Sequence, residues 1–305
     1  MGSRFLMRNA YARSTLRKYD GAVSEFLQWS RMSGNSAWNV QDLDEIMCDY
    51  LYYLFEDGQG RTKGVETIYG LIALFPGWRA AFPSASLSLK GWRRLVPVSS
   101  YPPLTWDLTV LLACEVTRMG HPVLGLGFLL SFDCLLRINE LLALGRDDVA
   151  TPSDLRLGVS GSDGGVRLRL KVTKTGRDQW VAVKSIFVTT WLLSLLRTIP
   201  KGVRIFPYSA IAARAIFKKA ALSLGMSSSY VPHSLRHGGA TALHLAGVSM
   251  EDILLRGRWS SVKSARAYIQ VGKALLLDMV VSPELLTRAR TAADQLSSRC
   301  AGSRL

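Results

Sequence analysis

The residues best suited to do chemistry lie in one short segment, VPHSLRHGGATALHLAG, from Val231 to Gly247. His233 and Arg236 are three positions apart, so on a helix that begins near Ser234 they share one face at its N-terminal end. An imidazole and a guanidinium at a helix N-terminus favour an anion such as a phosphate. The alternative for this stretch alone is a capping histidine beside a surface arginine. A zinc pair of His233 and His237 is disfavoured, because no Glu or Cys ligand lies nearby in the sequence.

The charge of the chain also points to a polyanion. Its 305 residues include 38 Lys and Arg against 23 Asp and Glu, a formal net charge of +15. Between Gly165 and Ala220 there are 12 basic residues and one acid, Asp178. The sequence is 48% hydrophobic, so the chain is expected to be globular. A basic block of this size in a globular protein favours a nucleic acid partner over a basic surface that only keeps the protein soluble.

Several other classes of protein are disfavoured. The N-terminal MGSRFLMRNAYARSTLRK has no apolar segment of a secretory signal, and the longest apolar run, PVLGLGFLLSFDCLL, is short and broken by Asp133. Four widely spaced cysteines fit a reducing compartment and no disulfide framework: Cys48, Cys114, Cys134 and Cys300. We expect an intracellular protein, nuclear in a eukaryote or in the cytoplasm or nucleoid of a prokaryote, without a membrane partner, metal, cofactor or small-molecule substrate.

The elements that must position these residues form two domains. Two segments in which apolar residues recur with helical spacing end near Gly34 and Gly58, and each predicts a helix. VETIYGLIALFPGWRAAFP predicts at least one more helix. We therefore expect a small helical domain over residues 1–97. LKGWRRLVPVSSYPPLTWD has no readable period and predicts a linker at about Leu89 to Tyr101, for which we set the bounds 98–104. The second domain then covers residues 105–305.

The second domain is predicted to be mainly helical with a small β-hairpin. TWDLTVLLACEVTRMG, VLGLGFLLSFDCLLRINELLAL, KSIFVTTWLLSLLRTI and SAIAARAIFKKAALSLG have helical patterns. Between them, apolar residues alternate with basic ones from Val166 to Val172, a turn follows at Thr175-Gly176, and Gln179 to Val183 is a second β-prone run. This pattern predicts two antiparallel strands.

The residues around the opening segment resemble the tyrosine recombinase (phage integrase) family. HSLRH matches the family's H-x-x-R-H motif, and Trp259 stands nine residues before Tyr268, the spacing of the family's His-or-Trp position from its nucleophilic tyrosine. LLRINELLAL supplies the first arginine, Arg137, and Glu140. Lys174, in VTKTGRDQW, occupies the place of the family's hairpin lysine, and STLRKYDGAVSEFLQW is similar to its core-binding domain.

The resemblance covers nearly the whole chain in the expected order, with two departures. Leu135 and Arg258 stand where the family commonly has glycine, and both are changes of shape near the expected site. Trp in place of His at position 259 is an alternative that the family uses. The segment GRWSS…SARAYI is more similar to recombinases of eukaryotic mobile elements than to housekeeping bacterial ones.

The resemblance implies a mechanism in which DNA is cut without a metal or ATP. Tyr268 would attack a phosphodiester and hold the DNA as a 3′-phosphotyrosyl ester. Arg137 and Arg236 would bind the non-bridging oxygens, and Lys174 would protonate the leaving 5′-oxygen. His233 would assist proton transfer near the tyrosine, and Trp259 would donate its indole N–H to the phosphate.

Further residues are expected to support this site. Glu140 would orient a catalytic group, and His237 would be structural. The residues expected to bind DNA are Arg13, Arg17, Lys18, Arg167, Arg169, Lys171 and Arg177. The partner implied by the resemblance is double-stranded DNA held by four protomers, which exchange strands in pairs.

Two other functions remain open at this stage. One is a DNA-binding module derived from an integrase that has lost its chemistry, because TALHLAGVSMEDILLRGRW has helix-turn-helix spacing. The other is a type IB topoisomerase. The terminal segment after Val281 predicts an amphipathic helix that begins with Ser282 as its N-cap. This helix packs either on its own domain or on a neighbouring protomer.

Overall fold

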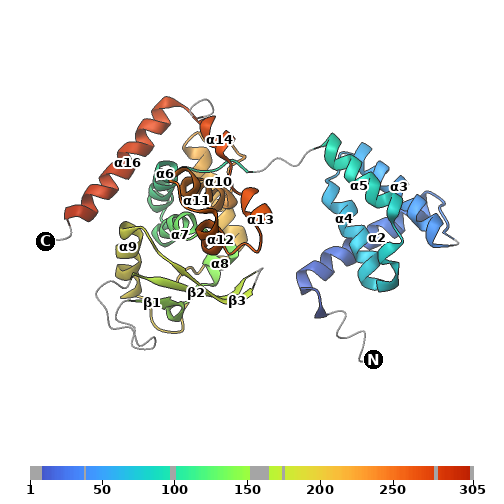
Figure 1. Cartoon of the computed structure of the whole chain (residues 1–305), viewed down its shortest axis with the longest axis horizontal. Coiled ribbons are helices and arrows are strands. Elements are labelled where there is room, and N and C mark those ends of the chain that lie inside the picture. The colour runs from blue at the N-terminus through green and yellow to red at the C-terminus, as the bar shows by residue number, and fades with distance from the viewer. Residues whose placement is uncertain are drawn as a thin grey trace. The chain divides into compact units, whose positions relative to one another are not determined.

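A computed structural model of the chain describes residues 9–37, 39–96, 101–151, 165–173, 176–277 and 281–302. The chain divides into two compact units, Met1–Ser99 and Ser100–Leu305, here called the N-terminal and C-terminal units (Figure 1). The described part of the chain is mainly helical, with three strands in the C-terminal unit. Among the described helices, none combines the length and the apolar character needed to cross a membrane.

The N-terminal unit is a helical bundle. Its elements are α2 (Arg13–Met32), α3 (Val40–Glu56), α4 (Arg61–Leu74), the 3-10 helix η1 (Pro76–Ala80) and α5 (Pro83–Leu95). Their apolar faces meet in one core that includes Phe26, Met47, Tyr50, Leu71 and Trp92. The buried carboxylate of Asp44 on α3 accepts N–H bonds from Ser84 and Ala85, both at 2.9 Å, and so caps α5 from a neighbouring helix.

One sequence expectation is wrong here. The segment from Leu89 was predicted to be a linker, yet Leu89–Leu95 is the second half of α5. The helix begins at Pro83 and ends at Leu95, and the prolines that suggested a linker, at positions 97, 102 and 103, all follow its end.

The C-terminal unit surrounds a larger apolar core. Its helices are α6 (Trp106–Arg118), α7 (Pro122–Asp133), α8 (Ile138–Ala143), the 3-10 helix η2 (Arg146–Asp148), α9 (Ile186–Leu196), α10 (Ala210–Ser223), α11 (Pro232–Leu245), α12 (Met250–Gly257), α13 (Val262–Arg266), α14 (Val271–Leu275) and α16 (Pro283–Gly302). Its strands are β1 (Val149–Ala150), β2 (Arg167–Thr173) and β3 (Gly176–Ala182).

The predicted hairpin is confirmed. β2 and β3 pair antiparallel from Arg167↔Ala182 to Thr173↔Gly176, and β1 adds a third strand through Val149↔Leu168. Leu168 and Leu170 are buried while Arg167 and Lys171 are exposed, as the alternating sequence requires. The third strand was not predicted, because two residues carry no detectable alternation.

The helical pattern that runs through LLRINELLAL is interrupted. α7 ends at Asp133 and α8 begins at Ile138. Between them Leu135 takes a left-handed conformation with φ of 50° and is fully buried. This conformation costs a non-glycine residue roughly 1–2 kcal/mol, and it places Arg137 at the N-cap of α8 instead of inside a helix.

The terminal helix α16 packs on its own unit, against α6 and α9 (Figure 1). The side chains of Leu285, Ala289 and Ala293 are buried there and belong to the main core. Ser282 accepts an N–H bond from Leu285 at 3.3 Å, which agrees with the predicted N-cap. Of the two expected placements of this helix, the structure therefore has the one within the same chain.

Candidate active site

α11 is held unusually close to its neighbours at the point where it carries the histidines. A Cβ on Gly238 would lie 1.9 Å from the carbonyl oxygen of Leu104, and a Cβ on Gly239 would lie 2.2 Å from that of Phe132. Any side chain at either position would collide with backbone, which explains the paired glycines of HSLRHGGA. His233 lies in the first turn of α11, one residue after Pro232 at N1.

Tyr268 is the centre of the site. It lies in the turn that follows the end of α13. Its half-buried ring lies 5.2 Å from the ring of His233, 4.7 Å from that of His237 and 4.8 Å from that of Trp259, measured between centroids. The structure therefore brings together four residues that the sequence placed in one site.

His237 holds the backbone of the tyrosine. Its Nδ1 lies 3.2 Å from the carbonyl oxygen of Tyr268. A carbonyl oxygen can only accept, so Nδ1 is the protonated nitrogen of this neutral ring. Thr241, one turn later on α11, accepts an N–H bond from Gln270 at 2.9 Å. One face of α11 thus fixes the chain on both sides of residue 269.

Both histidines are neutral at pH 7. Burial, followed by the charges of His237 and Arg236, lowers the pKa of His233 to about 4. Burial also lowers the pKa of His237 to about 4, against the opposing effect of its bond to Tyr268. A neutral His233 beside Tyr268 is in the state needed to accept a proton.

Arg236 is turned inward. It is fully buried; its Nη1 donates to the carbonyl oxygen of Leu135 and its Nη2 to that of Gly257. Its guanidinium carbon lies 4.5 Å from the ring centroid of Trp259 and 5.2 Å from that of Tyr268. Burial, then the charges of Arg137 and Arg258, lower its pKa to about 9. In this arrangement the two aromatic rings cover the arginine that was expected to meet the phosphate.

Trp259 is folded back on the end of α12. A Cβ on Gly257 would lie 1.8 Å from its ring, so residue 257 has to be glycine for the ring to take this place. Its indole Nε1 is buried and, within the described part of the chain, has no hydrogen-bond partner, and the same holds for Nε of Arg236. Buried N–H groups without a partner are costly, and they are rare except where a ligand or water completes them.

Arg137 and Glu140 form a pair at the start of α8. Nη1 of Arg137 lies 2.5 Å from Oε1 of Glu140, and the backbone N–H of Arg137 donates to Oε2 at 2.9 Å. Burial raises the pKa of Glu140, but Arg258 and Arg137 more than offset this and bring it below its ordinary value. The carboxylate is therefore ionised and holds the arginine by an ion pair.

Arg137 and His233 line one cleft of about 750 Å³. The other lining residues that the sequence did not single out include Tyr101, Arg214 and Lys218. The Tyr101 ring lies 5.9 Å from the ring of His233. Arg214 and Lys218 are four residues apart on the exposed face of α10, so this spacing within the basic block was the signal that could have found them.

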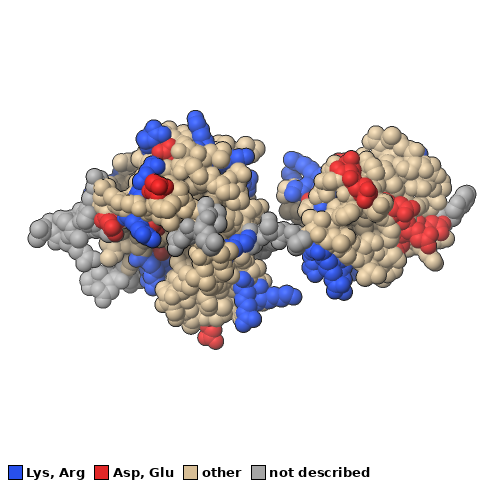
Figure 2. Space-filling model, turned by 90° about the horizontal axis from the view of Figure 1, so that it is seen from above, with Lys and Arg blue, Asp and Glu red and all other residues tan. Residues whose placement is uncertain are grey.

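The other predicted residues are more scattered. Lys174 and the side chain of Arg177 lie outside the described residues. Arg13, Arg17 and Lys18 lie exposed on α2, and Arg167 lies exposed on β2. Arg169 pairs with Asp178 at 2.6 Å, and Lys171 pairs with Asp148 at 2.9 Å. Figure 2 shows Lys and Arg side chains on the surface of both units. Among the described residues, no group of three His, Cys, Asp or Glu is placed to hold a metal ion.

Comparison with known proteins agrees with this arrangement. The sequence model of the phage integrase family matches residues 123–274. The chain is similar to a lambda integrase dimer bound to a COC′ core site, at 15% identity over 87% of this chain and 91% of that one, with a TM-score of 0.62. It is also similar to the Tn1549 transposon integrase in complex with transposon right end DNA, at 11% identity over 95% and 96%, with a TM-score of 0.60.

A third similar structure is the XerH site-specific recombinase bound to its difH substrate, at 15% identity over 77% of this chain and 69% of that one, with a TM-score of 0.53. No curated protein matches the sequence. These likenesses establish the fold. The family model covers residues 123–274, which contain Arg137, His233, Arg236, Trp259 and Tyr268, and this match makes the chain a member of the phage integrase family, the tyrosine recombinases.

Proposed function

We propose that the chain is a site-specific DNA recombinase that cuts and rejoins DNA through a 3′-phosphotyrosyl intermediate on Tyr268. The observation that carries this proposal is the single cluster in which the Tyr268 ring contacts His233, Trp259 and Arg236. An isolated tyrosine on a helical segment is usually a core residue. A tyrosine surrounded by a neutral imidazole, a guanidinium and an unpartnered indole N–H has the groups that phosphoryl transfer requires.

In the proposed reaction the Tyr268 oxygen forms a bond to phosphorus as the bond to the 5′-oxygen breaks. His233 takes the phenolic proton, and Lys174 gives a proton to the departing 5′-oxygen, which leaves as a 5′-hydroxyl. Arg137, which already faces the cleft, holds a non-bridging oxygen. One phosphoester replaces another, so attack by a 5′-hydroxyl restores the DNA without an external energy source.

Arg236 and Trp259 take part only after Tyr268 moves. The tyrosine ring lies over the guanidinium at 5.2 Å, so a phosphate cannot reach Arg236 while the ring is in this place. Rotation of Tyr268 toward the cleft would expose the guanidinium and the indole N–H together. The phosphate would then satisfy both groups, and the two N–H donors would stabilise the charge that develops in the transition state.

Binding of duplex DNA is proposed to involve both units. The N-terminal unit would serve as the core-binding domain through Arg13, Arg17 and Lys18. The C-terminal unit would add Arg167, Arg169, Lys171 and Arg177 of the hairpin, with Arg214 and Lys218 at the rim of the cleft. Four protomers would assemble on two sites and exchange strands in pairs. Such an enzyme acts where chromosomal DNA is kept, the nucleus of a eukaryote or the nucleoid of a prokaryote.

A library of nicked duplexes with random centres tests this function. Cleavage next to the nick releases a short fragment, so the covalent adduct accumulates and its DNA can be sequenced. We expect wild-type protein to trap a defined sequence, and Arg137→Ala and Arg236→Ala to lower the adduct yield by about 100-fold or more. A wild-type protein that binds DNA but traps none of the library would refute the proposal.

One observation favours the second candidate, a module that binds DNA without cutting it. Both terminal nitrogens of Arg236 are already bonded to carbonyl oxygens, so the residue also serves as a buried cross-link between α11, the Leu135 turn and α12. If this is its whole role, Arg236→Lys will unfold or weaken the protein while DNA affinity per folded molecule stays the same. The same library then yields bound but never covalent DNA.

A further inference from the structure

Arg258 occupies an unusual position next to the active site. It is the C-cap of α12, with a left-handed φ of 58°, and it precedes Trp259 directly. Left-handed backbone at a helix end favours glycine. Arg258 is nevertheless 7% exposed, so a long charged side chain is buried in a place where a residue without a side chain would fit the backbone better.

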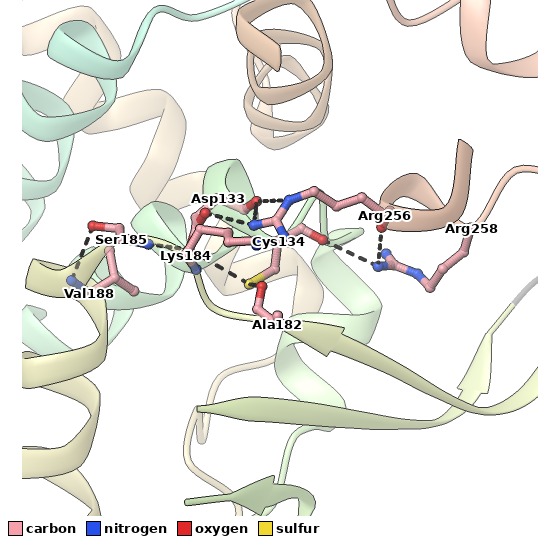
Figure 3. A network of polar contacts seen from close by, with 8 residues as sticks. All are labelled: Asp133, Cys134, Ala182, Lys184, Ser185, Val188, Arg256 and Arg258. Atoms are coloured by element: carbon pink, nitrogen blue, oxygen red, sulfur yellow. Dashed lines mark hydrogen bonds and ion pairs between the residues drawn. The ribbon is translucent and has the colours of Figure 1, made fainter. Parts of the chain in front are cut away.

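The Arg258 guanidinium joins α12 to the turn before Arg137. Its Nη2 donates to the carbonyl oxygen of Leu135 and to Oε2 of Glu140, both at 2.9 Å. Its Nη1 donates to the carbonyl oxygens of Arg256 at 3.0 Å and Cys134 at 3.2 Å, the second of which is seen in Figure 3. Two left-handed turns, at residues 135 and 258, are thus locked together by one side chain.

Glu140 is shared between this guanidinium and that of Arg137. Oε2 accepts from Arg258 and from the backbone N–H of Arg137, while Oε1 pairs with the Arg137 side chain. The side chains of Glu140 and Arg258 are almost completely buried, at 5% and 3% exposure, whereas that of Arg137 is 20% exposed at the cleft. A carboxylate held on its inner side by a fixed cation can present its other oxygen to Arg137 in one direction only.

We propose that Arg258 is a positioning residue that fixes the Glu140 carboxylate and thereby aims the Arg137 guanidinium into the cleft. The inference rests on the proposed function, in which Arg137 holds the scissile phosphate. It also links the two halves of the site, because the residue after Arg258 is Trp259. The indole and the Arg137 guanidinium are then set relative to one another by a single buried contact.

Arg256 provides a matched control two residues away. Its Nη2 donates to Oδ1 of Asp133 at 2.8 Å and to the Asp133 carbonyl oxygen at 2.6 Å (Figure 3). Oδ2 of Asp133 accepts N–H bonds from Lys184 at 2.8 Å and Ser185 at 3.2 Å. This pair also ties α12 to α7 through an arginine whose side chain is only 11% exposed, but it does not touch Glu140.

The first measurement is the pKa of the Glu140 carboxyl, from a ¹³C NMR titration of the DNA-free protein. We expect Arg258→Met to raise this pKa and Arg258→Lys, which keeps the charge, to raise it less. Arg256→Met should leave it at the wild-type value. Arg258→Gly, which suits the left-handed turn, should raise it as Arg258→Met does and serves if the Met variant does not fold. An unchanged Glu140 pKa in the folded Met or Gly variant would overturn the proposal.

The second measurement is a double-mutant cycle on adduct formation at saturating DNA. Arg258→Met should slow cleavage by about 10- to 100-fold when Arg137 is present and by no more than about 2-fold in an Arg137→Ala background, because its effect passes through Arg137. Equal slowing in both backgrounds would show a general structural role and contradict the inference. If the wild-type protein forms no adduct, the proposed function fails, while the titration still decides whether Arg258 holds Glu140.

Discussion

At the scale of single residues, removal of the indole N–H of Trp259 should change the cleavage rate far more than it changes the stability of the protein. Trp259→Phe keeps an aromatic ring and removes a donor that has no partner in the described part of the protein. We expect the cleavage rate at saturating DNA to fall by about 100-fold, because a transition-state donor is lost. The free energy of unfolding should fall only by the amount due to the smaller ring.

Trp106→Phe is the control for this prediction. Trp106 packs against the main core and does not line the cleft, so its loss of ring volume should cost stability while cleavage per folded molecule is unchanged. Cleavage that is equally fast in wild type and Trp259→Phe would remove the indole from the mechanism.

The buried His237 and the half-buried His233 make stability depend on pH. Their pKa of about 4 in the folded protein lies below the ordinary value of 6.5, so between these values the unfolded chain binds more protons. Their stabilising contribution is therefore fully present above pH 6.5 and is lost as pH falls toward 4. We expect urea unfolding to show a loss of stability from pH 7 to pH 5 that is smaller in His237→Asn. Equal losses in the two proteins would contradict the neutral, buried state of His237.

Glu140 acts in the same direction at lower pH. Its pKa lies below the ordinary value of 4.5, so its contribution is present above pH 4.5 and is lost as pH falls further. The loss of stability due to the histidines can be separated from the loss due to Glu140. As pH falls, the histidines of the unfolded chain take up protons near pH 6.5, whereas Glu140 does so only near pH 4.5.

Which residues gather at the site was predictable, but the direction of their side chains was not. Spacing along the sequence identified Tyr268, Trp259 and His233. The inward orientation of Arg236 depends on carbonyl groups 101 and 21 residues away, so no local pattern contains it. Arg258 was noticed only as a departure in shape, because its partner Glu140 lies 118 residues earlier in the chain.

At the scale of elements, α16 is part of the fold of its own unit, because it packs on α6 and α9. Leu285→Ala should lower the free energy of unfolding by about 2–4 kcal/mol, since it removes a buried side chain from the main core. Chemical denaturation of the DNA-free protein measures this. The loss should not depend on protein concentration. A loss that grows on dilution would mean that the helix docks on a second protomer.

The exposed Leu275 on α14 provides the control, since Leu275→Ala should change stability by less than about 0.5 kcal/mol. Truncation after Val281 should destabilise the C-terminal unit by more than Leu285→Ala does. A truncated protein as stable as the whole chain would show that α16 is dispensable for folding.

Long periodic elements were predictable, and short or locally strained ones were not. The alternation in β2 and the helical periods of α2 and α3 come from one buried face, which the sequence records directly. The break between α7 and α8 depends on the left-handed conformation of Leu135. A leucine within an apolar run gives no sign of such a turn in the sequence. Tertiary packing imposes that turn, because the Leu135 carbonyl oxygen accepts from both Arg236 and Arg258.

At the scale of the whole molecule, the positive charge should govern DNA affinity through salt. Each side chain that neutralises a phosphate contributes about one unit to the slope of log affinity against log salt. Arg167→Ala, Arg214→Ala and Lys218→Ala should each reduce the slope by about one. Arg118→Ala should leave it unchanged, because Arg118 pairs with Glu115 at 2.7 Å and does not line the cleft. Equal slopes in all variants would refute this assignment of the DNA-binding face.

The central claim is that Tyr268 becomes covalently attached to DNA, and a denaturing gel with end-labelled nicked substrate tests it most directly. Tyr268→Phe removes only the hydroxyl, so the variant should bind DNA as tightly as wild type and form no adduct. Tyr101→Phe, at a second tyrosine of the same site region, should still form the adduct. An adduct that persists in Tyr268→Phe, or that disappears only in Tyr101→Phe, would contradict the account.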